Sequence, residues 1–554
     1  MAESTSTDAG TQNGHTDYLH PRPRKPNNIR FTQPHLADDI QAATQNGLLK
    51  EPGSGVSSGR STPIPPDAPP SVQASSSARR HIRAQQKRRI FPTVEYVDRV
   101  SHFDPASDYR DFRGFFVLFW IGLAIMGITS MLRSLKETGY PLNIRQWHLF
   151  KEKVWELALS DGAMVASTAL SLPLHELYIN VDGLRWNGLG MAIQSIYQAI
   201  WLAFWTAFPF IRDWSWTAQV FFTLHLLAIG MKMHSYAFYM GHLSETRRRL
   251  NDLDDPDNKT SKAAAYRYPR PRTHLSEIPQ SPSDEDQDQI STAELRQLRE
   301  DLAFELASPL GNVSYPENFT LFNFVDFVFC PTLCYEIEYP RTPKTRWMEV
   351  FYKTLAVMGC IFLMTITTEE FVLPVLDEAS IALQSASSAS EFCLIMGETI
   401  GRLLFPFMCL FLLVFLSIFE YVLGAFAEIT RFADRQFYAD WWNSSDWLEF
   451  SREWNKPVHH FFRRHVYSAS KSHVSRPVAT LITFIISALA HELVMGCITR
   501  KFRGYGFFAM MLQMPFVMIQ RSRFFRGKKL LHNVLFWCSM ILGLAMMCAL
   551  YVLV

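Results

Sequence analysis

Apolar residues occur along this chain in long runs that are separated by polar and charged stretches. A helix needs roughly 20 apolar residues to cross about 30 Å of hydrocarbon, and each run is close to that length. The runs cover residues 114–132, 154–174, 189–210, 216–239, 348–374, 402–427, 478–498, 505–520 and 533–554. We therefore predict an all-α polytopic membrane protein with about nine transmembrane helices, because helices satisfy their backbone hydrogen bonds internally.

The first polar stretch, residues 1–90, is rich in Ser, Pro, Gly, Gln and charge. It has no apolar segment near Met1 of the kind that a cleavable signal contains. We predict a disordered cytosolic tail that ends in a basic cluster, Arg79 to Arg89, which lies on the anionic cytoplasmic face of the membrane. Residues 91–554 are then the membrane domain.

Charges in the connecting segments indicate the topology. Residues 243–346 and 428–477 contain clusters of Lys and Arg and are predicted to be cytosolic, whereas residues 375–401 contain neither and are predicted to be a lumenal loop. Arg500, Lys501 and Arg503 do not fit this alternation, so the run at 505–520 is predicted to be tilted or re-entrant.

The insert at residues 243–346 contains a capping box, Ser291 and Glu294, in front of an amphipathic helix. That helix would pack on the membrane domain or pair with a second subunit. Its apolar face carries Leu295, Leu298, Leu302 and Leu306. Just before the insert, Lys232, His234 and Tyr236 are expected to snorkel to the membrane interface.

The eight cysteines lie mostly in apolar runs without paired spacing, which favours free buried thiols over a disulfide framework. Cys330 and Cys334 have no second Cys or His pair nearby, and the segment that begins His491-Glu492 lacks the second histidine of a zinc protease helix. We expect no metal site. The net charge of +2 says little, because local blocks of opposite sign cancel.

The run at 478–498 carries an ionisable pair, His491 and Glu492, well inside a bilayer-length segment. Ionisable groups at that depth are costly and are usually kept for function. An apolar environment favours the neutral imidazole, which has the free lone pair that a general base requires. The alternative is a core histidine that is hydrogen-bonded across helices. Glu492 points about 100° away from its neighbour on a helix and is a poor direct partner for it.

The loop that precedes this run supplies groups that a reaction centre needs. Asn455 offers an amide for orienting a substrate or stabilising an oxyanion. Cationic side chains suited to phosphates and aromatic side chains suited to stacking or to the interface surround it. They are Arg452, Lys456, Arg463, Arg464, Arg476, Trp441, Trp442, Trp447, Trp454 and Tyr467.

The segment FYADWWN at residues 437–443 resembles the FYxDWWN signature of the membrane-bound O-acyltransferase superfamily, in the branch that esterifies sterols and diacylglycerol with acyl-CoA. The resemblance extends over roughly residues 90–554 and is greatest to the fungal sterol enzymes. It is carried further by MKMHSYAFY (231–239), YEIEYPRTPKTRW (335–347), FSREWNKPVHHFFRRHVY (450–467), SALAHE (487–492) and MLQMP (511–515). Small departures, Lys456 and Pro457 after Asn455 and the doubled histidine at His460, concern the detail of the pocket.

The resemblance implies that helices surround an intramembrane reaction chamber, with His491 as the catalytic histidine and Asn455 as its partner. Residues near the acyl-CoA would be Arg452, His459, Tyr467, Arg476 and Ser487. The motif would shape the CoA site and hold the fold through Phe437, Tyr438, Asp440, Trp441, Trp442 and Asn443.

The implied reaction transfers a long-chain acyl group from acyl-CoA, a co-substrate and not a cofactor, to the 3-hydroxyl of an ergosterol-type sterol from the bilayer. The resulting steryl esters would serve storage and sterol homeostasis. The resemblance further implies a multi-pass protein of the endoplasmic reticulum membrane with a cytosolic N-terminus, surrounded by lipid, assembled as a dimer or tetramer and without a nucleic-acid partner. Two alternatives stay open: diacylglycerol or another lipid alcohol as acceptor, and a proton-coupled transporter, which would show inverted repeats.

Overall fold

The computed structural model of the chain describes residues 91, 94, 96–101, 113–140, 151–254, 298–308, 310–520 and 528–554. The predicted tail at 1–90 lies outside these residues, as do the capping box and Leu295. The insert helix is seen from residue 298 to 306, where Leu302 and Leu306 are buried. Leu306 belongs to the largest apolar cluster of the membrane domain, which favours packing on that domain over pairing with a second subunit.

All nine apolar runs are helical, and the described residues form isolated β-bridges but no strand. The all-α prediction is therefore confirmed. The helices of the first half are α3 (Arg113–Thr138), α5 (Val154–Ser167), α6 (Ser171–Asn180), α7 (Met191–Ile211), α8 (Trp216–Asp254) and α10 (Leu321–Phe329). Those of the second half are α11 (Trp347–Thr367), α12 (Leu373–Ser385), α13 (Ala389–Phe415), α14 (Leu423–Ile429), α15 (Trp447–Glu453), α16 (Lys456–Phe461), α17 (Ser468–Lys471), α18 (Arg476–Thr499), α19 (Tyr505–Gln520) and α20 (Lys529–Leu553).

Six helical segments in the described part of the chain are long and apolar enough to cross a membrane, fewer than the nine expected. They are Val117–Thr138, Val154–Asn180, Trp347–Ser385, Ala389–Ile429, Arg476–Thr499 and Leu530–Leu553. The apolar helix α19 is shorter. Helices α7 and α8 are not among the six, and both bury polar side chains, such as Gln194 and Gln219, against other helices. The protein is a multi-pass membrane protein by these segments.

The predicted lumenal loop at 375–401 is mostly helix, so that expectation was wrong about its structure. Helix α12 continues to Ser385, and α13 begins at Ala389 with Ser388 as its cap, whose hydroxyl accepts a hydrogen bond from the Glu391 amide. Asp377 and Glu378 are exposed on α12 while the apolar side of that helix is buried. A helix can expose acidic side chains along one face and still bury the other, so charge alone did not indicate a loop.

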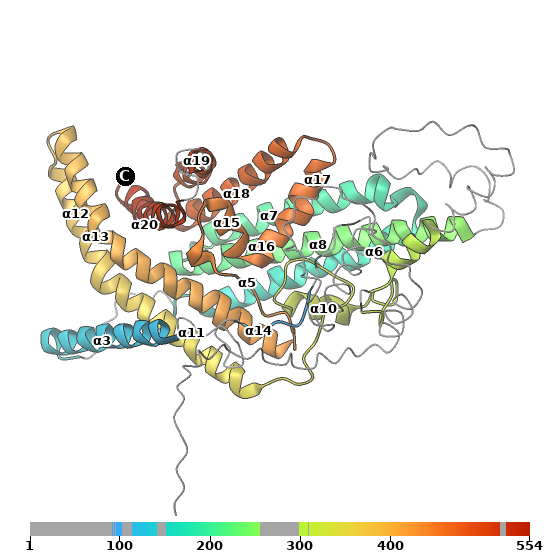
Figure 1. Cartoon of the computed structure of the whole chain (residues 1–554), viewed down its shortest axis with the longest axis horizontal. Helices are drawn as coiled ribbons and strands as arrows, with labels where there is room; N and C mark the ends of the chain where they lie inside the picture. Colours follow the sequence, from blue (N-terminus) through green and yellow to red (C-terminus); the bar gives the residue numbers. More distant parts are fainter. Residues whose placement is uncertain are drawn as a thin grey trace, which may run out of the picture. The chain divides into compact units, whose positions relative to one another are not determined.

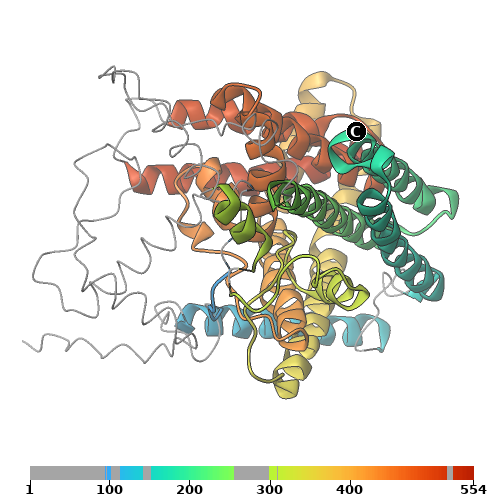
Figure 2. The ribbon, with the colours of Figure 1, turned by 90° about the vertical axis from the view of Figure 1, so that its right-hand side faces the viewer.

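Helices close in space come from distant parts of the chain. Helix α13 packs against α20 and α12, and α18 packs against α19 and α8 (Figure 1). Helices α5 and α7 both pack on α8, and this group is coloured teal to green in Figure 2. The largest apolar cluster joins α8, the segment after α10, the π-helical turn η7 (Leu416–Val422) and the motif at 437–443. The motif therefore lies in the core of the membrane domain.

The polar side chains at the end of the fourth run do not snorkel to the interface as predicted. Lys232 is buried and donates hydrogen bonds to the carbonyl oxygens of Phe327 (2.9 Å) and Cys330 (2.6 Å). Tyr236 is fully buried among aromatic rings, and His234 bonds to Gln198 at 3.0 Å. Lys232 therefore ties α8 to the C-terminal end of α10, and His234 ties α8 to α7.

Candidate functional site

The motif loop at 437–443 folds back on the helix that follows it. The Phe437 carbonyl accepts a hydrogen bond from the Lys456 amide (2.9 Å), and the Ala439 amide donates to the Glu453 carbonyl (2.8 Å). A 3-10 turn, η8 (Trp441–Asn443), closes the loop, and the Asn443 amide donates to the Asp440 carbonyl at 2.9 Å. The backbone of the motif is thus bonded both to itself and to residues Glu453 and Lys456.

The buried side chains of the motif connect three helical elements. The Tyr438 hydroxyl donates to the Glu420 carboxylate of η7 at 3.1 Å. The Trp441 ring packs edge-on against Phe415 (4.9 Å) and Trp454 (4.9 Å). From the other side, α20 binds the carbonyl oxygen of Trp442 through Asn533 Nδ2 (2.9 Å) and Trp537 Nε1 (3.1 Å). These contacts support the scaffolding role that the resemblance implied for the motif.

Asn455 is the N-terminal cap of α16. Its Oδ1 accepts a hydrogen bond from the Val458 amide at 3.1 Å, and a proline occupies the first turn, where no amide donor is needed. This explains the Lys456-Pro457 departure, because the pair builds a short helix behind the cap. The capping bond uses only Oδ1, and the Nδ2 group is the half of the amide that can donate to a substrate.

The two histidines of α16 are uncharged at neutral pH. Burial, followed by the positive charges of Arg463 and Arg452, lowers the pKa of His459 to about 4. Burial, followed by His459, lowers the pKa of His460 to about 4. Neutral imidazoles in this position can donate or accept one hydrogen bond to a ligand without adding charge.

The cations of the motif loop divide into two groups. Arg464 is buried, pairs with Glu336 at 2.9 Å and stacks over Phe91 and Tyr239, so the expectation that it meets phosphates was wrong. By contrast, the side chains of Arg452, Arg463, Lys471 and Arg476 are exposed. Arg476 is the first residue of α18, and Tyr467 ends the π-helical turn η9 (Phe462–Tyr467) that packs against α18. Within this second group, Arg476 can meet an anionic ligand at the start of α18.

His491 lies in α18, fifteen positions after Arg476, which corresponds to ~22 Å at 1.5 Å per residue. Its Nδ1 lies 2.8 Å from the Ser487 carbonyl oxygen. Because a carbonyl only accepts, Nδ1 is the protonated nitrogen of the neutral tautomer, and the lone pair of that tautomer lies on Nε2. The resemblance places Ser487 near the acyl-CoA, and the structure bonds the His491 ring to the backbone carbonyl of Ser487, one turn earlier in α18.

The His491 ring is exposed, but not on the apolar face of its helix. The exposed apolar side chains of α18 are Val478, Leu481, Ile486 and Leu489. At about 100° per residue, His491 points roughly 150° away from their mean direction. A lipid-facing surface is the apolar one, so the ring opens toward the opposite side of α18 and not toward the exposed apolar face.

Glu492 serves the fold instead of orienting the histidine, as its direction on the helix predicted. Its carboxylate accepts hydrogen bonds from the amides of Gly504 (2.7 Å) and Phe507 (3.2 Å) and from the Tyr551 hydroxyl (2.8 Å). It thereby caps the start of α19 and ties α18 to α20. Gly504 has a φ of +80°, a conformation that favours glycine.

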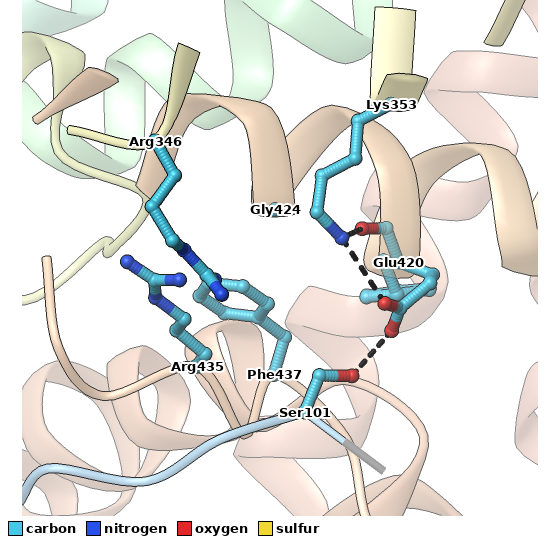
Figure 3. A pocket seen from close by; sticks show the side chains of 8 residues that line it. Ser101, Arg346, Lys353, Glu420, Gly424, Arg435 and Phe437 are labelled. Carbon is cyan, nitrogen blue, oxygen red and sulfur yellow. Dashed lines mark hydrogen bonds and ion pairs between the residues drawn. The ribbon is translucent and has the colours of Figure 1, made fainter. Parts of the chain in front are cut away.

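Asn455 and His491 are not joined by a hydrogen bond within the part of the chain that the structure describes, so their partnership stays a prediction. Sequence reasoning also missed a polar cluster beside the motif residue Phe437, formed by Ser101, Arg346, Lys353, Glu420 and Arg435 (Figure 3). The sequence did contain a signal for this cluster, because charged residues lie near the ends of two predicted spans. They are Arg346 and Lys353 at one span and Glu420 and Arg435 at the other.

Comparisons with known proteins identify the family of the chain. The model of the membrane-bound O-acyltransferase family matches residues 197–553. The chain is 41% identical over 446 residues to the probable sterol O-acyltransferase 2 of Schizosaccharomyces pombe, covering 80% of this chain and 87% of that protein. It is 33% identical over 482 residues to the probable sterol O-acyltransferase 1 of the same yeast, covering 84% and 87%. Similarity to the diacylglycerol O-acyltransferase 1 of Dictyostelium discoideum is 32% over 257 residues, covering 46% and 40%.

Proposed function

The chain belongs to the membrane-bound O-acyltransferase family, and we propose that it esterifies a membrane sterol with a long-chain acyl group from acyl-CoA. The observation that carries the choice of acceptor is coverage. Relatives named as sterol O-acyltransferases match 80% or more of this chain, whereas the relative named as a diacylglycerol enzyme matches 46%. The product would be a steryl ester for storage and sterol homeostasis, made in the endoplasmic reticulum membrane.

In this proposal His491 acts as the general base. Its Nε2 lone pair takes the proton of the sterol 3-hydroxyl as that oxygen attacks the thioester carbonyl. The C–O bond forms, the C–S bond breaks, and the proton passes from His491 to the departing CoA thiolate. The bond from Nδ1 to the Ser487 carbonyl fixes the tautomer that this step requires.

The remaining groups bind and position the substrates. The Nδ2 group of Asn455 stabilises the negative charge that develops on the carbonyl oxygen or orients the acceptor. The CoA phosphates lie near the exposed cations Arg452 and Arg476, beside the neutral His459 and Tyr467. A thioester is already activated, so bringing the two reactants together supplies much of the acceleration.

The test compares acceptors directly. Microsomes from cells that express the chain receive labelled oleoyl-CoA with ergosterol, cholesterol or diacylglycerol, and the products are separated by lipid chromatography. We expect label in steryl ester, and none above background with His491→Ala at equal protein abundance. Label in triacylglycerol alone would replace the sterol by diacylglycerol as the acceptor. Wild-type turnover by His491→Ala would remove the histidine from the mechanism.

Two further expectations belong to this proposal. The N-terminus is cytosolic, which protease protection of a tagged protein in sealed microsomes would test. The protein forms a homo-oligomer, a dimer or tetramer, which crosslinking in the native membrane would test.

A further inference from the structure

Helix α10 exposes an apolar face, although at nine residues it is too short to span a membrane. Its Phe322 side chain is 89% exposed, more than any other large apolar side chain in the described part of the chain. At about 100° per residue, the exposed apolar side chains of α10 fall within an arc of about 100°. This outer face consists of Leu321, Phe322, Val325 and Phe329. A contiguous apolar surface of this kind marks an interaction site.

The opposite face of α10 fixes the orientation of the helix. Phe324 and Phe327 are buried in the largest apolar cluster of the membrane domain. Asn323 is bonded on both sides, because its amide donates to the Thr320 hydroxyl at 3.1 Å and its Oδ1 accepts from the Tyr335 hydroxyl at 2.5 Å. The outer face therefore cannot turn inward without breaking these contacts.

A chain of contacts places α10 at the level where a candidate span ends. Asp326 of α10 forms an ion pair with Arg341. The Arg341 guanidinium also donates a hydrogen bond to the Thr430 carbonyl at 2.6 Å. Thr430 directly follows the span Ala389–Ile429. One arginine side chain thus joins α10 to the end of that span.

A second span begins at the same level. Arg346, one residue before α11, forms an ion pair with Glu428 in the last turn of α14. From its first turn α11 exposes large apolar side chains, among them Trp347 and Phe351. Tryptophan is typical of the boundary between hydrocarbon and headgroups. The apolar surface of α11 therefore reaches lipid at the level to which α10 is tied.

Exposed cations accompany this apolar surface. Lys344 and Arg431 are both exposed, and the Thr342 amide donates to the Arg431 carbonyl at 2.7 Å, which holds their two segments side by side. Positive side chains next to an apolar face are typical of helices that lie on a membrane surface. Lipid therefore fits this surface in both polarity and charge.

We propose that the outer face of α10 is immersed in the membrane leaflet at which α11 begins, while Lys344 and Arg431 meet lipid phosphates. Part of the insert at 243–346, predicted to be cytosolic, is then a helix that lies in the membrane surface. Because α10 also accepts the hydrogen bond of Lys232, it anchors the end of α8 to the lipid. This role is separate from acyl transfer.

Fluorescence of the purified full-length protein in liposomes tests this proposal. An amino acid whose emission depends on its environment replaces Phe322, whose exposure means that the change disturbs little packing. The liposomes contain phosphatidylcholine with a nitroxide quencher near the start or near the end of its acyl chain. We expect blue-shifted emission, and a greater loss of fluorescence with the nitroxide near the start, because a surface helix lies just below the headgroups. The same probe at Phe329 should behave alike.

Two control positions set the scale of quenching. A probe at Phe351, which is exposed on α11 within a span, should be quenched, whereas a probe at Lys471, a charged side chain exposed on α17, should not. Emission and quenching at Phe322 equal to those at Lys471 would leave the face in water and overturn the proposal. Blue-shifted emission without quenching by either lipid would place a second protein on this face, and would overturn it as well. The measurement needs no substrate, so its result is independent of sterol esterification.

Discussion

The carboxylate of Glu492 is predicted to hold α18 in the rotation that the reaction needs, although it does not touch the histidine beside it. It accepts three hydrogen bonds, from Gly504, Phe507 and Tyr551, that anchor α18 to α19 and α20. Glu492→Gln keeps the volume and one acceptor but turns an NH2 group toward backbone donors. We expect a loss of about 1.5–3 kcal/mol in the free energy of unfolding, the value of one hydrogen bond to a charged group.

The same substitution is expected to lower kcat while the KM for acyl-CoA stays unchanged, because the cations of the motif loop are not moved. The assay measures kcat and KM in microsomes and thermal unfolding in detergent. Glu378→Gln is the matched control, since Glu378 is exposed on α12 and its loss should change neither quantity. A Tyr551→Phe variant completes a double-mutant cycle with Glu492→Gln, and we expect a coupling of about 1 kcal/mol.

Two results would refute this account of Glu492. If Glu492→Gln unfolds at the wild-type temperature, the three hydrogen bonds do not stabilise the helix pair. If it is destabilised but retains the wild-type kcat, the rotation of α18 is not what positions His491. Additivity of Glu492→Gln and Tyr551→Phe would show that the contact between them contributes nothing.

Three further predictions follow from the motif loop. Asn455→Asp keeps the Oδ1 cap but loses the Nδ2 donor, so it should fold with wild-type thermal stability and lose most turnover. Asn455→Ala should lose both thermal stability and turnover. An active Asn455→Asp would exclude the donor role. Burial lowers the pKa of His459 and His460 to about 4, so between about pH 6.5 and pH 4 the unfolded chain binds protons that the folded protein does not. The free energy of unfolding should therefore be highest above about pH 6.5 and should fall toward pH 4. In thermal unfolding a His460→Gln variant should show a weaker pH dependence, and an unchanged profile would contradict this prediction. Trp441→Ala removes a fully buried ring and should cost about 3–5 kcal/mol, seen as loss of folded protein in size-exclusion chromatography, while truncating the exposed Trp155 should not.

The helices could be predicted from the sequence because the length and apolarity of a run are local properties. The same local reading failed where a side chain depends on a distant partner. The sequence predicted that Arg464 binds phosphate, but in the structure it pairs with Glu336. It predicted an interfacial position for Lys232, which instead donates to the carbonyls of Phe327 and Cys330. Such partners lie about a hundred residues away along the chain and leave no local signal.

The candidate site shows the same division. The direction of Glu492 away from His491 follows from helix geometry alone, and the structure agrees. The capping role of Asn455 could also have been predicted, since Asn followed by Lys-Pro is a helix start signal. In contrast, the polar cluster beside Phe437 brings together Ser101, Lys353 and Arg435, whose proximity depends on how α11 and η7 pack.

The hydrogen bonds from α20 to the carbonyl oxygen of Trp442 have a consequence for biosynthesis. Asn533 and Trp537 lie about ninety residues downstream of Trp442, whose carbonyl oxygen they bind. A nascent chain whose α18 has already entered the translocation machinery therefore still lacks the α20 hydrogen bonds that hold the motif loop. A protein that ends just before residue 529 should therefore be inserted in the membrane but inactive. Its tryptophan cluster would be exposed to quality-control ligases.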